Sequence, residues 1–305
     1  MTSFSRRAIF GAAGACLVPF ALDARPAAKR PEATEHLSEM FNLKSAEGRE
    51  YGVSIAYPLP EDPEIELALK GRKPVPIYTT DRWTSLGLLL SITRLMRWGG
   101  ELPPCVIVAI GYPDEEVAYK DDSRAFDLTP TSRPRGGKVD PKYGGAALFR
   151  SLIVNKVQPE LRRRGDFDHE NSVLFGHSFG GLFAFDTMIT APGAFRHYLS
   201  VSPSLWFDDR LIMKQFEAAL GRGQNFPGRF AIYTGEREER ISPPETRMTS
   251  NVLEVQRLIV KHRSQFEAPL AQILPGLSHH SILGIAATYG LQFLLSPPNR
   301  LQETY

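Results

Sequence analysis

The sequence predicts an α/β fold in which a mostly parallel sheet is covered by helices on both faces. From residue 41 onward, short apolar runs alternate with helical patterns, as they do in sheets buried on both sides. The chain has 305 residues, of which 42% are hydrophobic and 23% are charged, so a sizeable core can form. Because no repeat and no second linker interrupts this part, we expect residues 41–305 to form one domain.

Each expected element rests on its own apolar pattern. Runs with the length and content of buried strands lie at 51–57, 75–79, 105–110, 172–175, 197–201, 230–233 and 270–274. Helical patterns lie at 85–97, 145–163, 180–190, 209–220, 246–263 and 282–295. The helix at 145–163 has an apolar stripe made of Leu148, Leu152, Ile153, Val157 and Leu161. The long, proline-rich segment 111–143 is expected to lie above the sheet, where loops of such folds contact ligands.

The N-terminus has the pattern of an export signal. Arg6 and Arg7 precede an uncharged, mildly hydrophobic stretch at 8–22, which is typical of the twin-arginine route. This stretch is too short to span a bilayer stably. We therefore expect an export signal at 1–24, a linker at 25–40, and a periplasmic or secreted protein.

Composition excludes several other classes of function. The net charge is +2, from 36 basic and 34 acidic side chains, which gives no reason to expect nucleic acid or an anionic membrane as a partner. Cys16 lies in the expected signal. Cys105 begins an apolar run, and we expect it to be a buried, small hydrophobic residue. There is no His-x-x-x-His pair, no cysteine set and no dinucleotide or phosphate-loop motif, so we predict no metal and no cofactor.

The stretch Gly176-His177-Ser178-Phe179-Gly180 carries the most specific chemistry. It lies between an apolar strand pattern and an apolar helical pattern. A strand that turns sharply into a helix through Gly-x-Ser-x-Gly raises a serine hydroxyl above the sheet as a nucleophile. The serine is strained in such a turn, and a Cβ at either flanking glycine would collide with it. The sequence therefore predicts Ser178 as a nucleophile.

The general base is expected near the C-terminus. A serine hydroxyl needs an imidazole to take its proton, and α/β-hydrolases place this histidine after a late strand. His279 and His280 follow the strand at 270–274, whereas His197 lies in an expected strand and His262 in an expected helix. We predict His279 as the base, with His280 capping the next helix or contacting substrate.

The acid that fixes the histidine tautomer is expected after the strand at 230–233. Glu238 is the first choice and Glu236 the second, while Asp208, after the preceding strand, is a more distant third. The same charged run is also typical of a solvated surface turn. A Ser-His dyad without a strong acid is therefore a further alternative.

Two backbone N–H groups are needed to bind the oxyanion that forms during attack. Phe179, which follows the nucleophile, should supply one, and Arg82 or Trp83, after the early strand, the other. Trp83 is expected to line the substrate pocket or to lie in the core. Ser204 and Trp206 are further candidates for the pocket.

Outside the catalytic positions, Arg124 and Asp127 are expected to form a salt bridge that orders the segment 111–143.

The chain resembles the putative-esterase family of α/β-hydrolases, which includes enterobactin-type siderophore esterases and esterase D-like enzymes. The resemblance extends from residue 51 to the C-terminus, and it implies an α/β-hydrolase fold with Ser178 and His279 as the catalytic pair and Glu238 as the acid. The matching stretches are Ile110-Gly111-Tyr112, residues 124–130, Tyr143-Gly144-Gly145-Ala146, residues 176–181, residues 202–206 and the segment from Pro275 to Ile282.

Two departures from the family pattern concern the site directly. The early loop of the family reads Asp-Gly, whereas this chain has Asp81-Arg82, which affects the second oxyanion donor. The acidic residue two positions before the histidine is replaced by Leu277, which changes the electrostatics around His279.

The sequence thus favours a serine esterase that cleaves a small-molecule carboxylic ester, such as a siderophore ester, through an acyl-enzyme. An acyltransferase similar to the mycolyltransferases and a non-catalytic, hydrolase-like binding protein are the alternatives.

Overall fold

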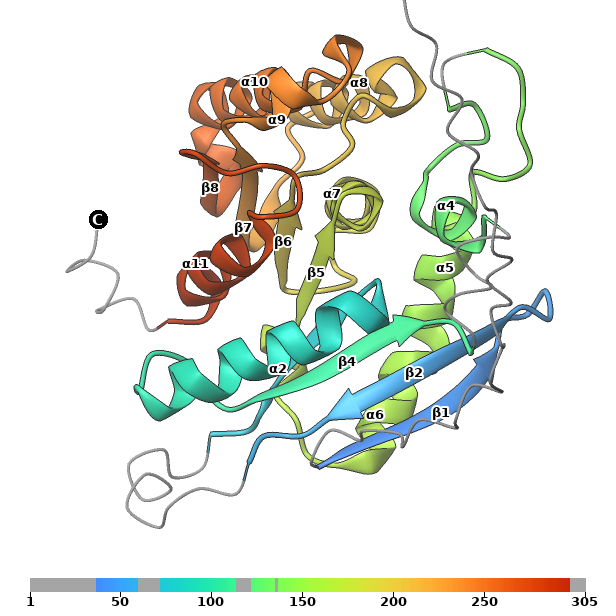
Figure 1. Cartoon of the computed structure of the whole chain (residues 1–305), viewed down its shortest axis with the longest axis vertical. Coiled ribbons are helices and arrows are strands. Elements are labelled where there is room, and N and C mark those ends of the chain that lie inside the picture. The colour runs from blue at the N-terminus through green and yellow to red at the C-terminus, as the bar shows by residue number, and fades with distance from the viewer. Residues whose placement is uncertain (1–36, 60–71, 114–121, 135–136, 297–305) are drawn as a thin grey trace, which may run out of the picture. The chain divides into compact units, whose positions relative to one another are not determined.

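A computed structural model of the chain describes residues 37–59, 72–113, 122–134 and 137–296 (Figure 1). The predicted export signal at 1–24 and residues 25–36 of the predicted linker lie outside these described residues.

Within the described residues, eight strands form one sheet in the order β1-β2-β4-β3-β5-β6-β7-β8 (Figure 1). β1 and β2 pair in antiparallel fashion, β2 is also antiparallel to β4, and every later pairing is parallel. The mostly parallel sheet predicted from sequence is therefore confirmed. The strands are β1 (Ser38–Lys44), β2 (Glu50–Ala56), β3 (Val75–Thr79), β4 (Cys105–Gly111), β5 (Val173–His177), β6 (His197–Val201), β7 (Phe226–Gly235) and β8 (Phe266–Leu274).

The buried strands lie close to their predicted positions, and β3 and β6 have the predicted bounds. β1 was not expected, since it begins at Ser38, inside the predicted linker. It is an edge strand with mostly exposed or half-exposed residues, and its polar sequence therefore lacks the apolar run of a central strand.

Helices cover both faces of this sheet, as predicted. α2 and α11 pack on one face, in a core that includes Leu89, Ile107 and Leu291. α5, α7, α8 and α10 pack on the other, around Tyr78, Leu174 and Phe183. The helices are α2 (Arg82–Trp98), α4 (Ser123–Leu128), α5 (Ala146–Leu152), α6 (Gln158–Arg164), α7 (Phe179–Thr190), α8 (Phe207–Gly221), α9 (Glu238–Ile241), α10 (Met248–Lys261) and α11 (Leu283–Leu295).

Cys105 lies in the core beside α2, as predicted, and its burial raises the pKa of its thiol to about 12.

The predicted helix at 145–163 is interrupted by a π-helical turn at Ile153–Val157. The amide of Gln158 bonds to the carbonyl of Ile153, five residues back, where an α-helix would use the carbonyl of Val154. The next residue, Pro159, has no N–H to donate to the carbonyl of Asn155. The apolar stripe is buried except for Leu148, which is 44% exposed; Phe149 takes the core position beside it.

The strand order reverses direction between β3 and β5. The chain proceeds outward from β3 to β4 on one side and from β5 to β8 on the other, so the connections after β3 and β5 diverge. In open α/β sheets, ligands bind at the carboxyl ends of the strands where the order reverses in this way. Residues that follow β3 and β5 are therefore brought together at this edge.

Candidate active site

The turn after β5 has the geometry expected of a nucleophile. Ser178 adopts φ 60° and ψ −118°, between the last residue of β5 and the first of α7, and this strained region persists only where the surroundings enforce it. A Cβ on Gly176 would lie 2.0 Å from the carbonyl oxygen of Gly180, and a Cβ on Gly180 would lie 2.3 Å from Thr80 Oγ1. Both positions therefore favour glycine. Ser178 itself is half-buried and is accessible to solvent.

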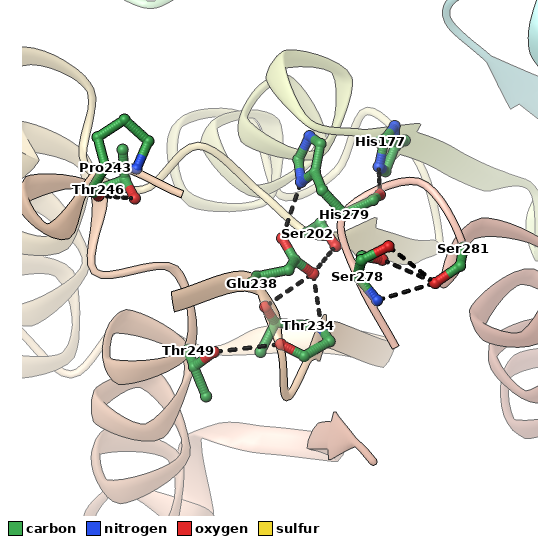
Figure 2. Close-up of polar contacts among 11 residues, drawn as sticks. His177, Ser202, Thr234, Glu238, Pro243, Thr246, Thr249, Ser278, His279 and Ser281 are labelled. Carbon is green, nitrogen blue, oxygen red and sulfur yellow. Dashed lines mark hydrogen bonds and ion pairs between the residues drawn. The ribbon is translucent and has the colours of Figure 1, made fainter. Parts of the chain in front are cut away.

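His279 and Glu238 are brought together beside this turn. His279 Nδ1 lies 2.8 Å from Glu238 Oε2, across the space between the end of β8 and the start of α9 (Figure 2). Because a carboxylate only accepts hydrogen bonds, Nδ1 carries a proton, and in the neutral imidazole Nε2 then keeps its lone pair. The ring of His279 is 4.6 Å from that of His177, the residue before Ser178.

Glu238 is completely buried and has a full set of donors. Its Oε1 accepts hydrogen bonds from Ser202 Oγ at 2.6 Å, the Gly235 amide at 2.6 Å and Thr234 Oγ1 at 3.2 Å (Figure 2). Burial acts to raise the pKa of this carboxyl, but the hydrogen bonds from His279, Ser202 and Gly235 outweigh it and hold the pKa below its usual value. The side chain is therefore an ionised acceptor at neutral pH.

The other two acids predicted for this role lie elsewhere. Glu236 is exposed and accepts a hydrogen bond from the Gly276 amide at 2.9 Å. Asp208 accepts one from Thr131 Oγ1 at 2.6 Å. Glu238 is thus the one member of the predicted trio that the structure places on His279.

The two predicted oxyanion donors lie at the starts of helices. Phe179 is the first residue of α7 and Arg82 the first of α2, so both amides lie at the positive ends of helix dipoles. Gly180 and Thr80 are in close approach, which places the two helix starts side by side. The side chain of Arg82 turns away and donates from Nη2 to the carbonyl of Tyr112 at 2.7 Å.

Arg124 links the residues that follow β3 to the serine turn that follows β5. Its guanidinium donates to both carboxylate oxygens of Asp81, at 2.5 and 3.0 Å, and lies 3.5 Å from the carbonyl oxygen of His177. It also lies over the ring of Phe179 at 5.8 Å. Asp81 has a left-handed backbone (φ 56°), which aspartate tolerates better than most residues. Arg124, in the described part of the segment predicted to lie above the sheet, therefore reaches the serine turn.

This arrangement corrects the predicted pairing of Arg124 with Asp127. Asp127 accepts hydrogen bonds from Tyr51 Oη at 3.0 Å and from Tyr112 Oη at 2.9 Å, with Arg49 at 3.8 Å. The two residues are three apart on the short helix α4. Arg124 binds the loop that follows β3, whereas Asp127 binds tyrosines in β2 and directly after β4. The two residues are close in the sequence, which suggested that they pair, but each has partners from elsewhere in the chain.

The predicted substrate-lining residues differ in their surroundings. Trp206 is half-buried, with its ring 6.2 Å from that of Phe179, and exposed His280 lies with its ring 5.2 Å from that of His279. Trp83 is 59% exposed on the first turn of α2, so it is not a core residue. Buried Ser204 donates its amide to the carbonyl of Ser178 at 3.3 Å.

Sequence reasoning missed three features of the site. His177 Nε2 lies 2.7 Å from the carbonyl oxygen of His279, and Ser202 and Thr234 both donate to Glu238. Ser202 and Thr234 lie at the ends of β6 and β7, so their place at the carboxyl edge was the available signal. At the position where the family has an acid, Leu277 packs against the core.

Within the described ranges, no cluster of three or more His, Cys, Asp or Glu residues could hold a metal ion. In the same residues, no helix has the length and apolar character needed to cross a bilayer.

The chain is similar to known esterases. The profile of the family described as "Putative esterase" matches residues 59–231. The chain is 30% identical over 235 residues to the ferri-bacillibactin esterase BesA of Bacillus subtilis, covering 72% of this chain and 78% of that protein. It is 29% identical over 287 residues to the siderophore triacetylfusarinine C esterase of Aspergillus fumigatus, covering 83% and 91%.

A solved structure shows the same fold. The siderophore hydrolase EstB from Aspergillus nidulans superposes with a TM-score of 0.75 at 24% identity, over 87% of this chain and 98% of that one. The profile match over more than half of the chain establishes that it belongs to the putative esterase family and is a carboxylic-ester hydrolase with the α/β-hydrolase fold.

Proposed function

We propose that Ser178 is the nucleophile, His279 the general base and Glu238 the orienting acid of this ester hydrolase. The hydrogen bond of 2.8 Å between His279 Nδ1 and the buried Glu238, beside the strained turn at Ser178, is the observation that carries the proposal. The bond leaves the Nε2 lone pair of His279 available to take the proton of a serine hydroxyl.

The reaction then proceeds through an acyl-enzyme. Ser178 Oγ forms a bond to the ester carbonyl carbon, the carbonyl oxygen becomes an oxyanion, and the hydroxyl proton moves to His279 Nε2. The tetrahedral species collapses as the alcohol leaves with that proton. Water then gives a proton to the same imidazole and attacks the acyl carbon, the carboxylic acid leaves, and the proton returns to Ser178 Oγ.

The amides of Phe179 and Arg82 are proposed to bind the oxyanion. This assignment is supported by the position of both residues, which begin helices next to the serine turn. Donors held in place before the reaction stabilise the developing charge without reorganisation, and removing one such donor typically costs about 10²–10³ in kcat. Arg124 supports this side, since it joins Asp81, the residue before Arg82, to the serine turn.

Glu238 has an electrostatic and a geometric role. When His279 takes the proton it becomes an imidazolium, and the ionised carboxylate stabilises this charge. The depressed pKa of Glu238 keeps it ionised at neutral pH, and its hydrogen bonds fix the direction in which Oε2 faces the ring.

We further propose a siderophore ester as the substrate class. Both curated relatives described above are named for siderophore esters, of bacillibactin and of triacetylfusarinine C. The aromatic surface formed by Trp206 and Phe179, together with exposed His280 and Trp83, offers contacts for the bulky groups around such an ester.

Residues 1–24 are proposed to direct export of the catalytic domain, whose first described strand is β1 (Ser38–Lys44). The paired arginines before an uncharged stretch support this. Sequencing of the N-terminus of the exported protein would test it, and an intact Met1 on that protein would refute it.

One experiment tests the catalytic assignment. The purified protein is assayed with p-nitrophenyl esters and with ferric siderophore esters, beside Ser178→Ala, and both are treated with a fluorescent organophosphonate. We expect labelling at Ser178 and a loss of kcat of about 10³-fold or more in the variant. Equal hydrolysis by both proteins would refute the role of Ser178.

Added alcohol acceptors separate hydrolysis from acyl transfer. If the acyl group appears on the alcohol in preference to water, the enzyme is an acyltransferase of the kind considered above. Tight binding of a siderophore without turnover or labelling would instead identify a binding protein.

A further inference from the structure

The histidine that acts as base must reach across the sheet. Ser178 follows β5 and His279 follows β8, with β6 and β7 between these strands. Neighbouring strands are about 4.8 Å apart, so the segment that carries His279 must extend roughly 14 Å to reach the serine turn. Such a segment needs anchors at both ends if its ring is to keep one orientation.

The anchors on the near side come from the end of β7. The amide of Glu236 donates to the carbonyl of Leu274 at 2.9 Å, and the amide of Arg237 donates to the carbonyl of Leu277 at 2.9 Å. The Gly276 amide adds a hydrogen bond to the Glu236 carboxylate. These contacts hold the start of the segment, several residues before His279.

The anchor on the far side is His177. Its Nε2 lies 2.7 Å from the carbonyl oxygen of His279, and the two rings lie 4.6 Å apart at 40° (Figure 2). A carbonyl oxygen is only an acceptor, so Nε2 of His177 carries the proton and donates. The residue next to the nucleophile therefore holds the backbone of the residue that bears the base.

The surroundings of His177 keep this donor neutral. Burial, and then repulsion by His279, lowers the pKa of His177 to about 4. The other groups that face it are His280, with its ring 6.2 Å away, and Asp81 and Arg124, which pair with each other. At neutral pH the imidazole can therefore donate to the carbonyl without placing a second positive charge beside the base.

We propose that His177 is a positioning residue, whose Nε2–H holds the His279 backbone so that its imidazole faces Ser178 and Glu238 together. This inference rests on the roles proposed above for those three residues. A displacement of about 1 Å in a catalytic group can cost about 10²-fold in rate, so loss of the anchor should lower kcat more than it changes KM.

Two matched variants test the proposal in the full-length protein. His177→Phe keeps a planar ring but removes the donor, whereas His177→Gln retains an N–H at nearly the same reach. After the active fraction is counted by organophosphonate titration, we expect kcat of the Phe variant to fall about 10–100-fold with KM within about threefold of wild type. The Gln variant should recover most of the lost kcat.

A second measurement does not depend on turnover. With the imidazoles labelled with 15N, the Nδ1–H of His279, bonded to Glu238, should give a single downfield proton signal in wild type and in His177→Gln. The signal should broaden or disappear in His177→Phe. This outcome would support the anchor even if Ser178→Ala showed that the proposed catalytic roles were wrong.

The proposal would be overturned by a Phe variant that keeps wild-type kcat and the sharp His279 signal. It would also be overturned if Phe and Gln lowered thermal stability equally while the kcat of the active fraction stayed unchanged, since His177 would then be a packing residue only.

Discussion

Two fully buried carboxylates lie at the carboxyl edge of the sheet and have contrasting partners. Glu238, after β7, accepts hydrogen bonds from Ser202, Thr234, the Gly235 amide and the imidazole of His279. Asp127, on α4, accepts them from two tyrosine hydroxyls, with a guanidinium 3.8 Å away. Both therefore replace the hydration lost on burial with protein donors.

The difference is whether a partner can exchange protons near neutral pH. The tyrosines bonded to Asp127 hold their protons more tightly than usual, because burial first and the negative charge of Asp127 second raise the pKa of Tyr51 and of Tyr112. An imidazole, in contrast, gains and loses a proton in this range. Burial and complete hydrogen bonding thus describe structural and candidate catalytic carboxylates equally well, and the partner distinguishes them.

The strongest test of this comparison replaces each carboxylate by its amide. Glu238→Gln should lower kcat by about 10²–10⁴-fold, because the amide cannot stabilise the imidazolium and favours the wrong tautomer of His279. Asp127→Asn should leave kcat within about threefold of wild type. The measurements are steady-state hydrolysis of a p-nitrophenyl ester and urea unfolding of each variant.

In Asp127→Asn the expected loss is one of stability. The amide has one acceptor oxygen in place of two, so one tyrosine hydroxyl loses its partner and the free energy of unfolding should fall by about 1–3 kcal/mol. If the folded fraction of Asp127→Asn lost as much kcat as Glu238→Gln, the two carboxylates would not differ in their role in the reaction.

The sequence allowed the local parts of this architecture to be predicted. The Gly-x-Ser-x-Gly turn is encoded within five consecutive residues, and the apolar runs of β3 and β6 give the bounds of both strands. These features depend on neighbours in the chain. Backbone sterics and burial pattern can therefore be read from the sequence directly.

The contacts that assemble the site join distant parts of the chain. His177 bonds to a carbonyl 102 residues away, Arg124 to a carboxylate 43 residues away, and Ser202 to one 36 residues away. No sequence period encodes such pairs, because they depend on which strands become neighbours. The charged run that contains Glu238 looked like a surface turn for the same reason, although Glu238, its second glutamate, is fully buried.

The pH dependence of stability should reveal the ionised state of Glu238. Its folded-state pKa is below its unfolded value of about 4.3, so the stabilisation is present above pH 4.3 and is lost as the pH falls through the folded-state pKa. The difference in unfolding free energy between wild type and Glu238→Gln should therefore narrow from pH 6 to pH 3. Urea unfolding at several pH values measures it, and a gap that widens on acidification would contradict the depressed pKa.

The smallest expected effects come from removing one hydroxyl from each carboxylate. Ser202→Ala takes away the 2.6 Å hydrogen bond to Glu238 Oε1, and Tyr112→Phe takes away the 2.9 Å hydrogen bond to Asp127 Oδ2. Each should cost about 1–2 kcal/mol of unfolding free energy. The losses should differ in activity, since a less firmly held Glu238 should lower kcat about threefold to tenfold, whereas Tyr112→Phe should leave it unchanged.

Kinetics and unfolding curves of these two variants, measured at one pH, give both quantities for each. Equal losses of kcat would mean that the two carboxylates support the site in the same way, through the rigidity of the sheet edge. A loss confined to Ser202→Ala would show that the hydrogen bonds around Glu238 act through His279. The partner of the buried charge, more than the burial itself, would then decide which carboxylate takes part in the reaction.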